Sequence, residues 1–325
     1  MNPPSQAVTG QDLANPVLQV VSNLFRWTGD IREAFRFTTP LVTIVPAKNP
    51  CLASPDSDHR HWSYTSRHGI RELNVGQCTE LWQRDANAPK PADRVFQVRV
   101  KDQLVAELPT AERAEELARR LQHALRNSDF EPSHLTPALI NGMPAGKVGD
   151  TVLFWVDPEL AALLDRNPEL LAITWINNLR ETLDVPPIPL TQAQSQMHRL
   201  TPTDQQIQGT ASWYGPYFHG RLTATGEIFN QTDLTAAHPT LPFNTYLKVT
   251  NLLTGKSLIV RINDRGPYFE DRSLDLSREA ARYLDSELTG VVPYEAVIME
   301  NEELAQVRSA NGLSALSASL TRSSR

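Results

Sequence analysis

A segment without hydrophobic periodicity divides this sequence into two parts. Residues 185–206 contain P-P-I-P-L, then T-Q-A-Q-S-Q and T-P-T-D-Q-Q, and proline with small polar residues is typical of a linker. Aromatic usage also changes across the segment, because five of the six tryptophans precede it and six of the seven tyrosines follow it. At 325 residues the chain is long enough for two hydrophobic cores. We therefore expect an α+β protein of two domains, with the boundary in this segment.

The N-terminal part combines an irregular stretch over 1–90 with an α/β pattern over 91–184. Alternating apolar residues on both sides of a Lys-Asp turn predict a hairpin over 96–107. Thr110 suits the cap position of a helix over 111–126, whose apolar residues fall on one face. The pattern predicts an accessory α/β domain of no recognised type.

Two tryptophans lie in the second half of this accessory domain. Trp155 belongs to an apolar strand predicted over 151–156. Trp175 belongs to a helix predicted to begin at Pro168, with Asn167 as its cap. Exposed tryptophans stack on sugars, but both residues follow the apolar periodicity of their elements. We therefore predict that both lie in the hydrophobic core.

The C-terminal part, residues 207–302, is rich in short apolar segments separated by turns. Its predicted strands are residues 208–214, 246–251, 257–263, 274–276 and 294–299. Ser277 suits the cap of a short helix that carries Ala280 and Ala281. Several short strands, one hairpin and short helices are typical of a small β-barrel. The tail over 303–325, rich in Ser, Ala and Arg, predicts disorder.

Charge and cysteine content narrow the possible partners. The formal net charge of −6 argues against nucleic acid, because an acidic surface does not attract phosphate. His59 and His61 suggest a metal, but nearby residues supply no matching ligands, so we expect an exposed loop. Cys51 and Cys78 either pair in an oxidising compartment or remain free thiols, and the sequence leaves both possibilities open.

The sequence shows neither a membrane-spanning segment nor a secretory signal. No run approaches the roughly 18–20 apolar residues of a membrane span. Residues 1–37 lack the basic start, apolar centre and small-residue cleavage site of a secretory signal. Two expectations remain: a cytosolic chain, or an exported chain whose signal is omitted from this sequence.

Three residues of the C-terminal part suit catalysis. Glu227 follows a glycine turn in T-A-T-G-E, His238 lies in T-A-A-H-P, and Asp264 closes an apolar strand in R-I-N-D-R-G-P. Acid–base chemistry on a sugar needs carboxyl groups at fixed positions, and an imidazole can assist them. These three residues are therefore the candidate catalytic group.

Seven motifs occur in order around these residues. They are G-T-A-S-W-Y-G (209–215), H-G-R-L-T-A-T-G-E (219–227), L-T-A-A-H (234–238), L-P-F-N-T (241–245), V-T-N (249–251), V-R-I-N-D-R-G-P-Y (260–268) and S-L-D-L-S-R-E-A-A (273–281). Together they resemble the RlpA-like lytic transglycosylases, in order and in spacing. The resemblance covers residues 207–300 and implies a six-stranded double-psi β-barrel there.

The resemblance also implies an activity. Members of that family cleave the β-1,4 bond between N-acetylmuramic acid and N-acetylglucosamine in peptidoglycan, on glycan strands without stem peptides. The muramyl C6 hydroxyl attacks in place of water, which leaves a 1,6-anhydro end, and no metal or organic cofactor is implied. The family's functional residues fall on Glu227, His238 and Asp264. We expect Asp264 to be the acid and base, Glu227 to stabilise the transition state, and His238 to bond a carboxylate or the substrate.

Neighbouring side chains are candidates for substrate binding. They are Trp213, Tyr217, Arg265, Tyr268 and Asp275. The aromatic rings suit stacking on sugar rings, with core packing as the alternative. Arg265 is expected either to bind acidic sugar substituents or to pair with Glu227. Asp275, in L-D-L-S, is expected either to support the fold or to touch the substrate.

A peptidoglycan substrate implies a periplasmic or cell-envelope location and a role in cell-wall turnover or septation. The accessory domain is then expected to bind cell-wall or division proteins, with a spacer as the alternative. The main alternative function is a non-catalytic, expansin-like glycan-binding protein, and another is an inert scaffold at the division site. The catalytic candidates favour the enzyme, because a pure binding protein does not need all three.

Overall fold

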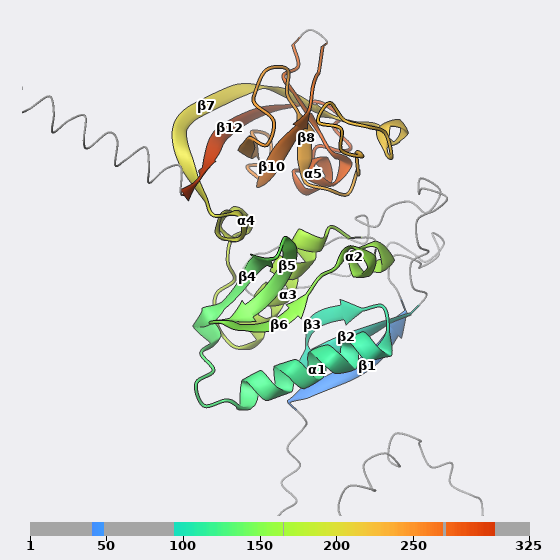
Figure 1. Ribbon diagram of the computed structural model, residues 1–325, viewed down its shortest axis with the longest axis vertical. Coiled ribbons are helices and arrows are strands. Elements are labelled where there is room, and N and C mark those ends of the chain that lie inside the picture. Colours follow the sequence, from blue (N-terminus) through green and yellow to red (C-terminus); the bar gives the residue numbers. More distant parts are fainter. Residues whose placement is uncertain (1–40, 49–93, 165, 269–270, 303–325) are drawn as a thin grey trace, which may run out of the picture. The chain divides into compact units, whose positions relative to one another are not determined.

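The computed structural model describes residues 41–48, 94–164, 166–268 and 271–302, which form three sheets and several helices (Figure 1). Two sheets have three strands each, in the orders β1-β2-β3 and β4-β5-β6, and the third is a closed barrel. The predictions for Cys51, Cys78, His59 and His61, and for the tail, lie outside the described residues.

The first sheet contains the predicted hairpin. Strands β2 (Arg94–Val100) and β3 (Gln103–Leu108) pair antiparallel around Lys101 and Asp102. Both turn residues have positive φ, 48° and 62°, which suits a tight hairpin turn. Strand β1 (Val42–Lys48) pairs antiparallel with β2, and it lies within the region over 38–90 that was expected to hold loops with short strands.

Helix α1 has the predicted bounds. It spans Ala111–Arg126, and the hydroxyl of Thr110 accepts a hydrogen bond from the backbone N–H of Arg113. A threonine in this position satisfies one of the free N–H groups at the start of a helix. The apolar face of the helix is buried at Ala114, Leu117, Leu121 and Ala124.

The second sheet begins with a hairpin that the sequence analysis missed. Strands β4 (Leu135–Ile140) and β5 (Met143–Val148) pair antiparallel, and β6 (Thr151–Trp155) continues the sheet. Asn141 and Gly142 form the first turn, with φ of 53° and 78°. Asn-Gly is a strong sequence signal for such a turn, so this hairpin was predictable.

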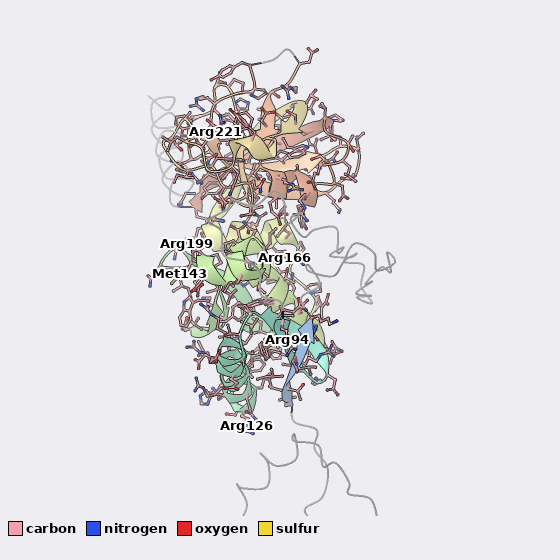
Figure 2. All side chains as sticks on the ribbon, turned by 90° about the vertical axis from the view of Figure 1, so that its right-hand side faces the viewer. Arg94, Arg126, Met143, Arg166, Arg199 and Arg221 are labelled. Carbon is pink, nitrogen blue, oxygen red and sulfur yellow. The ribbon has the colours of Figure 1, made fainter. Side chains whose placement is uncertain are left out.

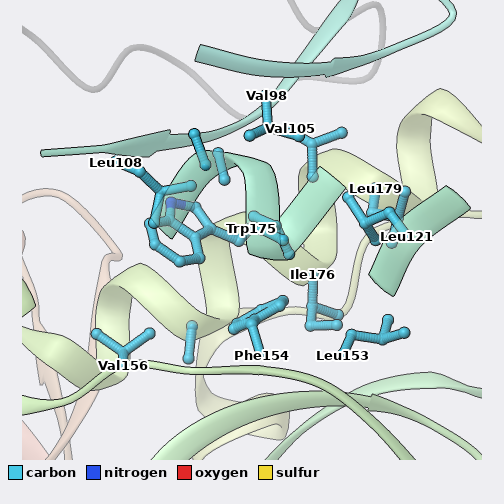
Figure 3. Packing of buried hydrophobic residues seen from close by; sticks show 14 of the residues in the cluster. Val98, Val105, Leu108, Leu121, Leu153, Phe154, Val156, Trp175, Ile176 and Leu179 are labelled. Atoms are coloured by element: carbon cyan, nitrogen blue, oxygen red, sulfur yellow. The ribbon is translucent and has the colours of Figure 1, made fainter. Parts of the chain in front are cut away.

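Two helices follow this sheet and close the accessory core. Helices α2 (Pro158–Leu164) and α3 (Pro168–Thr182) start at the predicted prolines, and the Asn167 side chain caps α3. Trp175 of α3 is 3% exposed and meets the ring of Phe154 edge-on, with ring centroids 5.2 Å apart. Figure 3 shows Trp175 among the buried side chains, as predicted.

The prediction for Trp155 was wrong. Its side chain is 37% exposed, and the Arg120 guanidinium lies 4.9 Å from the centre of its ring. The strand does not alternate simply, because the adjacent Leu153 and Phe154 are both buried, and Trp155 at its last position is exposed. The apolar content of the strand therefore did not reveal which of its residues are buried.

The segment predicted as a linker is ordered. Helix α4 (Leu190–His198) lies inside 185–206, and β7 (Leu200–Trp213) begins there. The helix buries a glutamine: the Gln194 side-chain amide donates to the Ile259 carbonyl at 3.0 Å and accepts from the Ile259 N–H at 2.8 Å. Because a polar residue occupies the buried face, the segment lacks the hydrophobic period that marks a helix.

The barrel has the six strands expected from the resemblance. They are β7, β8 (Thr235–Ala237), β9 (Tyr246–Asn251), β10 (Ser257–Asp264), β11 (Leu274–Leu276) and β12 (Val292–Asn301), in the closed order β10-β8-β11-β7-β12-β9. Helix α5 (Arg278–Tyr283) begins at Ser277, whose hydroxyl accepts from the Ala280 N–H. Strand β8 was missed because its three residues are too few for an alternating pattern.

No helix in the described ranges is long and apolar enough to cross a membrane. The described part of the chain also contains no cluster of three or more His, Cys, Asp or Glu side chains arranged to hold a metal ion.

Candidate active site

Asp264 occupies the last position of β10, beside the short strand β8. It pairs with Ala237, and the register of this parallel pair shifts between Ile262 and Asp264. Such an irregularity bends a strand and re-aims the side chains that follow it. Asp275 of β11 pairs with the same Ala237 from the other side. The two aspartates therefore lie on the two strands that flank β8.

Three donors hold the Asp264 carboxylate. Its Oδ1 accepts from the backbone N–H groups of Ala224 and Arg265, both at 2.8 Å. Its Oδ2 accepts from the Tyr214 hydroxyl at 3.0 Å. Burial, reinforced by the Asp264 charge, raises the pKa of Tyr214, so this phenol keeps its proton and remains a donor. The side chain of Asp264 is thus fixed by two loops and by the end of β7.

Glu227 is an ionised partner of Arg261. Each carboxylate oxygen accepts from one guanidinium nitrogen at 2.8 Å, and Asn263 donates at 3.1 Å. The Arg261 hydrogen bonds lower the pKa of Glu227 to about 2, against the opposing effect of burial. Glu227 is therefore a fixed negative charge at neutral pH. The expectation that Arg265 pairs with Glu227 was wrong, because Arg261 occupies that place.

The geometry of this pair predicts a measurable shift in the pKa of Glu227. In Arg261→Gln the pKa should rise from about 2 toward its ordinary 4.5, since the main cause of the depression is removed. The wild-type ion pair stabilises the fold above pH 4.5 and loses this contribution as the pH falls toward 2. NMR titration of the side-chain carboxyl carbon measures the value directly.

Lys256→Gln is a suitable control for this titration, because it removes a cation from the exposed pair with Asp285 in the same barrel. It should leave the Glu227 pKa at about 2. A pKa that stays at about 2 in Arg261→Gln would contradict the assignment of the shift to Arg261.

His238 follows β8 and is neutral. Its Nδ1 accepts from the backbone N–H groups of Thr240 and Leu241, at 3.2 and 3.1 Å. Burial, aided by the charge of Arg265, lowers the pKa of His238. With Nδ1 as an acceptor, the single proton of the neutral ring belongs on Nε2. The contact of His238 with Asp264 runs through the backbone, from the His238 N–H to the Asp264 carbonyl at 3.2 Å.

Arg265 supports the loop after β8. It donates to the carbonyl oxygens of His238 and Leu241, at 3.3 and 2.9 Å. Its guanidinium lies 3.7 Å from the centre of the Phe243 ring. These contacts direct its charge toward the protein backbone and an aromatic face.

The other candidate binding residues divide into exposed and engaged side chains. Tyr217 and Tyr268 are 68% and 80% exposed, and the Arg221 guanidinium lies over the ring of Tyr217, so each tyrosine still presents ring surface to a ligand. Trp213 donates its indole N–H to the Glu287 carbonyl at 3.1 Å and packs against the barrel core. Asp275 accepts from the Ser212 hydroxyl and lies 3.7 Å from an Arg272 nitrogen. The structure therefore leaves the two tyrosines more available than Trp213 and Asp275.

Sequence reasoning did not select four residues of this site: Tyr214, Asp233, Arg261 and Asn263. Burial raises the pKa of Asp233 to about 6, and the nearby charge of Arg261 opposes the rise. Arg261 and Asn263 are two residues apart on β10, so they share a face, and this alternation was a signal for their joint contact with Glu227. Nothing in the sequence indicated which of two adjacent aromatic residues at the end of β7 reaches Asp264.

Comparison with protein families agrees with this barrel. Residues 206–296 match the family model described as "Lytic transglycolase". Residues 92–185 match another model, described only as a domain of unknown function. The chain is thus an α+β protein with a separate N-terminal domain and a C-terminal double-psi β-barrel of the lytic transglycolase type. Specifically, the barrel is an RlpA-like domain, which confirms the resemblance.

Three curated relatives carry this likeness. The probable endolytic peptidoglycan transglycosylase RlpA of Synechocystis sp. is 42% identical over 194 residues, which are 56% of this chain and 60% of that protein. The endolytic peptidoglycan transglycosylases RlpA of Campylobacter jejuni and Pseudomonas aeruginosa are 55% and 57% identical over 89 and 85 residues. These cover 27% and 26% of this chain, and 32% and 25% of the relatives. The chain therefore spans less than two thirds of each of these relatives.

Among solved structures, the Streptomyces papain inhibitor matches with a TM-score of 0.25 and 20% identity, covering 30% of this chain and 97% of that chain. An apo expansin of Clavibacter michiganensis matches with a TM-score of 0.24 and 22% identity, covering 29% and 50%.

Proposed function

We propose that this protein is an endolytic peptidoglycan lytic transglycosylase that cleaves the bond between N-acetylmuramic acid and N-acetylglucosamine in peptide-free glycan strands. The observation that supports this most is the setting of Asp264, a carboxyl group held by three donors at a strand end beside exposed tyrosines. The printed names of the relatives point to the same reaction.

In the proposed reaction a single carboxyl group acts twice. The reaction starts from Asp264 that has taken up a proton, and this carboxyl group gives the proton to O4 of the departing N-acetylglucosamine as the bond between C1 and O4 breaks. The C6 hydroxyl oxygen of the muramyl residue then forms the new bond to C1. Its proton passes to the Asp264 carboxylate, which restores the starting state. No water is consumed, and the product ends in a 1,6-anhydro ring.

Glu227 and His238 assist without exchanging protons. The carboxylate of Glu227 remains ionised, so it supplies negative charge to the oxocarbenium-like transition state, moderated by Arg261. Neutral His238 offers the proton on Nε2 as a hydrogen-bond donor to the substrate. We propose Tyr217 and Tyr268 as stacking surfaces for sugar rings. Trp213, Asp275 and Arg265, which bond to other parts of the barrel, would hold the surrounding strands and loops in place.

Tyr214→Phe tests the placement of Asp264. The variant loses the hydroxyl that donates to Oδ2, and a hydrogen bond to a charged group is worth about 1.5–3 kcal/mol. We expect kcat to fall about tenfold or more with little change in KM, measured by the release of soluble glycan fragments. In the control Tyr294→Phe the lost hydroxyl contacts Ser273 instead, and kcat should be retained. Equal kcat in Tyr214→Phe and wild type would refute this role.

A non-catalytic glycan-binding protein is the rival from another class, and an inert scaffold is the third. Incubation of peptide-free strands with the protein separates them, when strand length and binding are measured on the same sample. Shortened strands support the enzyme. Intact strands that co-sediment with the protein support the binding protein, and intact strands that remain unbound support the scaffold.

The remaining assignments follow from the proposed substrate. The protein would act in the periplasm or cell envelope, where peptidoglycan lies, and participate in cell-wall turnover or septation. The N-terminal domain over 91–184 would bind cell-wall or division proteins. The barrel domain would extend over 207–302.

A further inference from the structure

Three arginines lie on the segments that carry Glu227 and Asp264, and two of them already bond to groups within the protein. Arg261 is bound by both oxygens of Glu227, and Arg265 by two loop carbonyls. Arg221 lies in the loop before Glu227 and is exposed. Among the described residues no carboxylate forms an ion pair with it, so its charge is available to a ligand. Figure 2 shows Arg221 on the barrel part of the chain.

The contact of Arg221 with an aromatic ring positions its guanidinium to bind an anion. Its guanidinium carbon lies over the ring of the exposed Tyr217, 3.4 Å from the ring centre. Such stacking holds the guanidinium plane while its N–H groups still point outward along the edge. A planar carboxylate accepts two parallel hydrogen bonds from this edge. Arg221 and Tyr217 thus form a preorganised carboxylate receptor.

This receptor is connected to Asp264 by continuous contacts. Tyr217 packs edge-on against Phe218 at 5.6 Å between ring centroids, and Phe218 against Tyr214 at 5.4 Å. Tyr214 in turn donates to Asp264. Arg221 also lies three residues before Ala224, whose N–H binds Asp264, so the two backbones are at most roughly 10 Å apart. The loop that carries Arg221 is therefore the loop that bonds to the proposed acid.

We propose that Arg221, backed by Tyr217, binds the free lactyl carboxylate of a muramic acid residue close to the cleaved bond. This inference rests on the proposed function and names a specificity residue for it. Removal of the stem peptide leaves a carboxylate on the lactyl group, whereas attachment of the peptide converts it into a neutral amide. A guanidinium that binds this carboxylate would favour peptide-free strands over strands that carry the peptide. The ion pair with Arg261 moderates the repulsion between Glu227 and this carboxylate.

Paired substrates test the proposal. One batch of peptide-free strands keeps its lactyl carboxylates, and a second batch of equal length has them converted into methylamides. Wild-type protein should favour the carboxylate strands in kcat/KM by about 10- to 100-fold, as expected for one charge-assisted contact. In Arg221→Gln this preference should fall close to one. Arg126→Gln is the matched control, because it removes an exposed arginine at the end of α1 and should keep the wild-type preference.

Equilibrium binding separates this inference from the proposed activity. The same two strand preparations are titrated into Asp264→Asn and into Asp264→Asn combined with Arg221→Gln. A preference for carboxylate strands that disappears with Arg221 supports the anion site even if wild-type protein cleaves neither strand. An equal preference with and without Arg221, or no preference in either protein, would overturn the anion site whether or not cleavage occurs.

Discussion

Asp264→Asn should reduce kcat on peptide-free glycan strands by on the order of 10⁴-fold, because the same carboxyl group is proposed to donate and then accept the proton. The amide matches the carboxylate in shape, and each of its contacts can be retained. Its oxygen can accept from Ala224 and Arg265, while its nitrogen donates to the Tyr214 oxygen. Loss of activity is therefore expected without loss of the fold, checked by circular dichroism and by release of soluble fragments.

Asp285→Asn is the matched control for this substitution. Asp285 pairs with Lys256, in the turn that precedes β10, and Asp264 lies at the other end of that strand. Because an exposed pair contributes about 1 kcal/mol or less, both stability and activity should be close to wild type. An Asp264→Asn protein that retains most of its kcat would refute the assignment of the acid.

Trp175→Ala should lower the free energy of unfolding by about 3–5 kcal/mol, the usual cost of removing a large buried aromatic side chain. Trp175 is 3% exposed and packs edge-on against Phe154, so its removal leaves a cavity in the accessory core. Urea unfolding followed by far-UV circular dichroism measures the loss.

Trp155→Ala provides the comparison from the same domain. Trp155 is 37% exposed, and its main described partner is the Arg120 guanidinium, a contact worth about 0.5–1 kcal/mol at exposed sites. We expect a loss of about 1 kcal/mol. Equal losses in the two variants would contradict the burial that separates these tryptophans.

Local sequence signals were sufficient for elements with strong periodicity. The bounds of α1 followed from Thr110 and one apolar face, and the β2–β3 hairpin from alternation around a turn. The barrel came from the ordered motifs rather than from periodicity, because strands as short as β8 carry almost no pattern. Helix α4 was not predicted for a different reason. Its buried Gln194 bonds to the Ile259 backbone, so a polar residue stands where the pattern of a helix requires an apolar one.

The sequence selected three residues of the candidate site but not the residues that bond to them. The motifs selected Glu227, His238 and Asp264, and the structure places all three on segments that adjoin β8 or β10. The choice of arginine for Glu227 depends on which residues of β10 share a face, and Arg261 satisfies this while Arg265 lies beyond the strand. Long-range contacts of this kind depend on barrel closure, which no local pattern encodes.

The chemistry of the new chain ends tests most directly whether this protein is a lytic transglycosylase. Peptide-free glycan strands are incubated with wild-type protein in water labelled with heavy oxygen, and the fragments are analysed by mass spectrometry. The proposed reaction predicts 1,6-anhydro-muramyl ends that carry no label, absent from digests with Asp264→Asn. Labelled reducing ends would identify a hydrolase, and intact strands would identify a protein that does not cleave them; either result would contradict the proposed function.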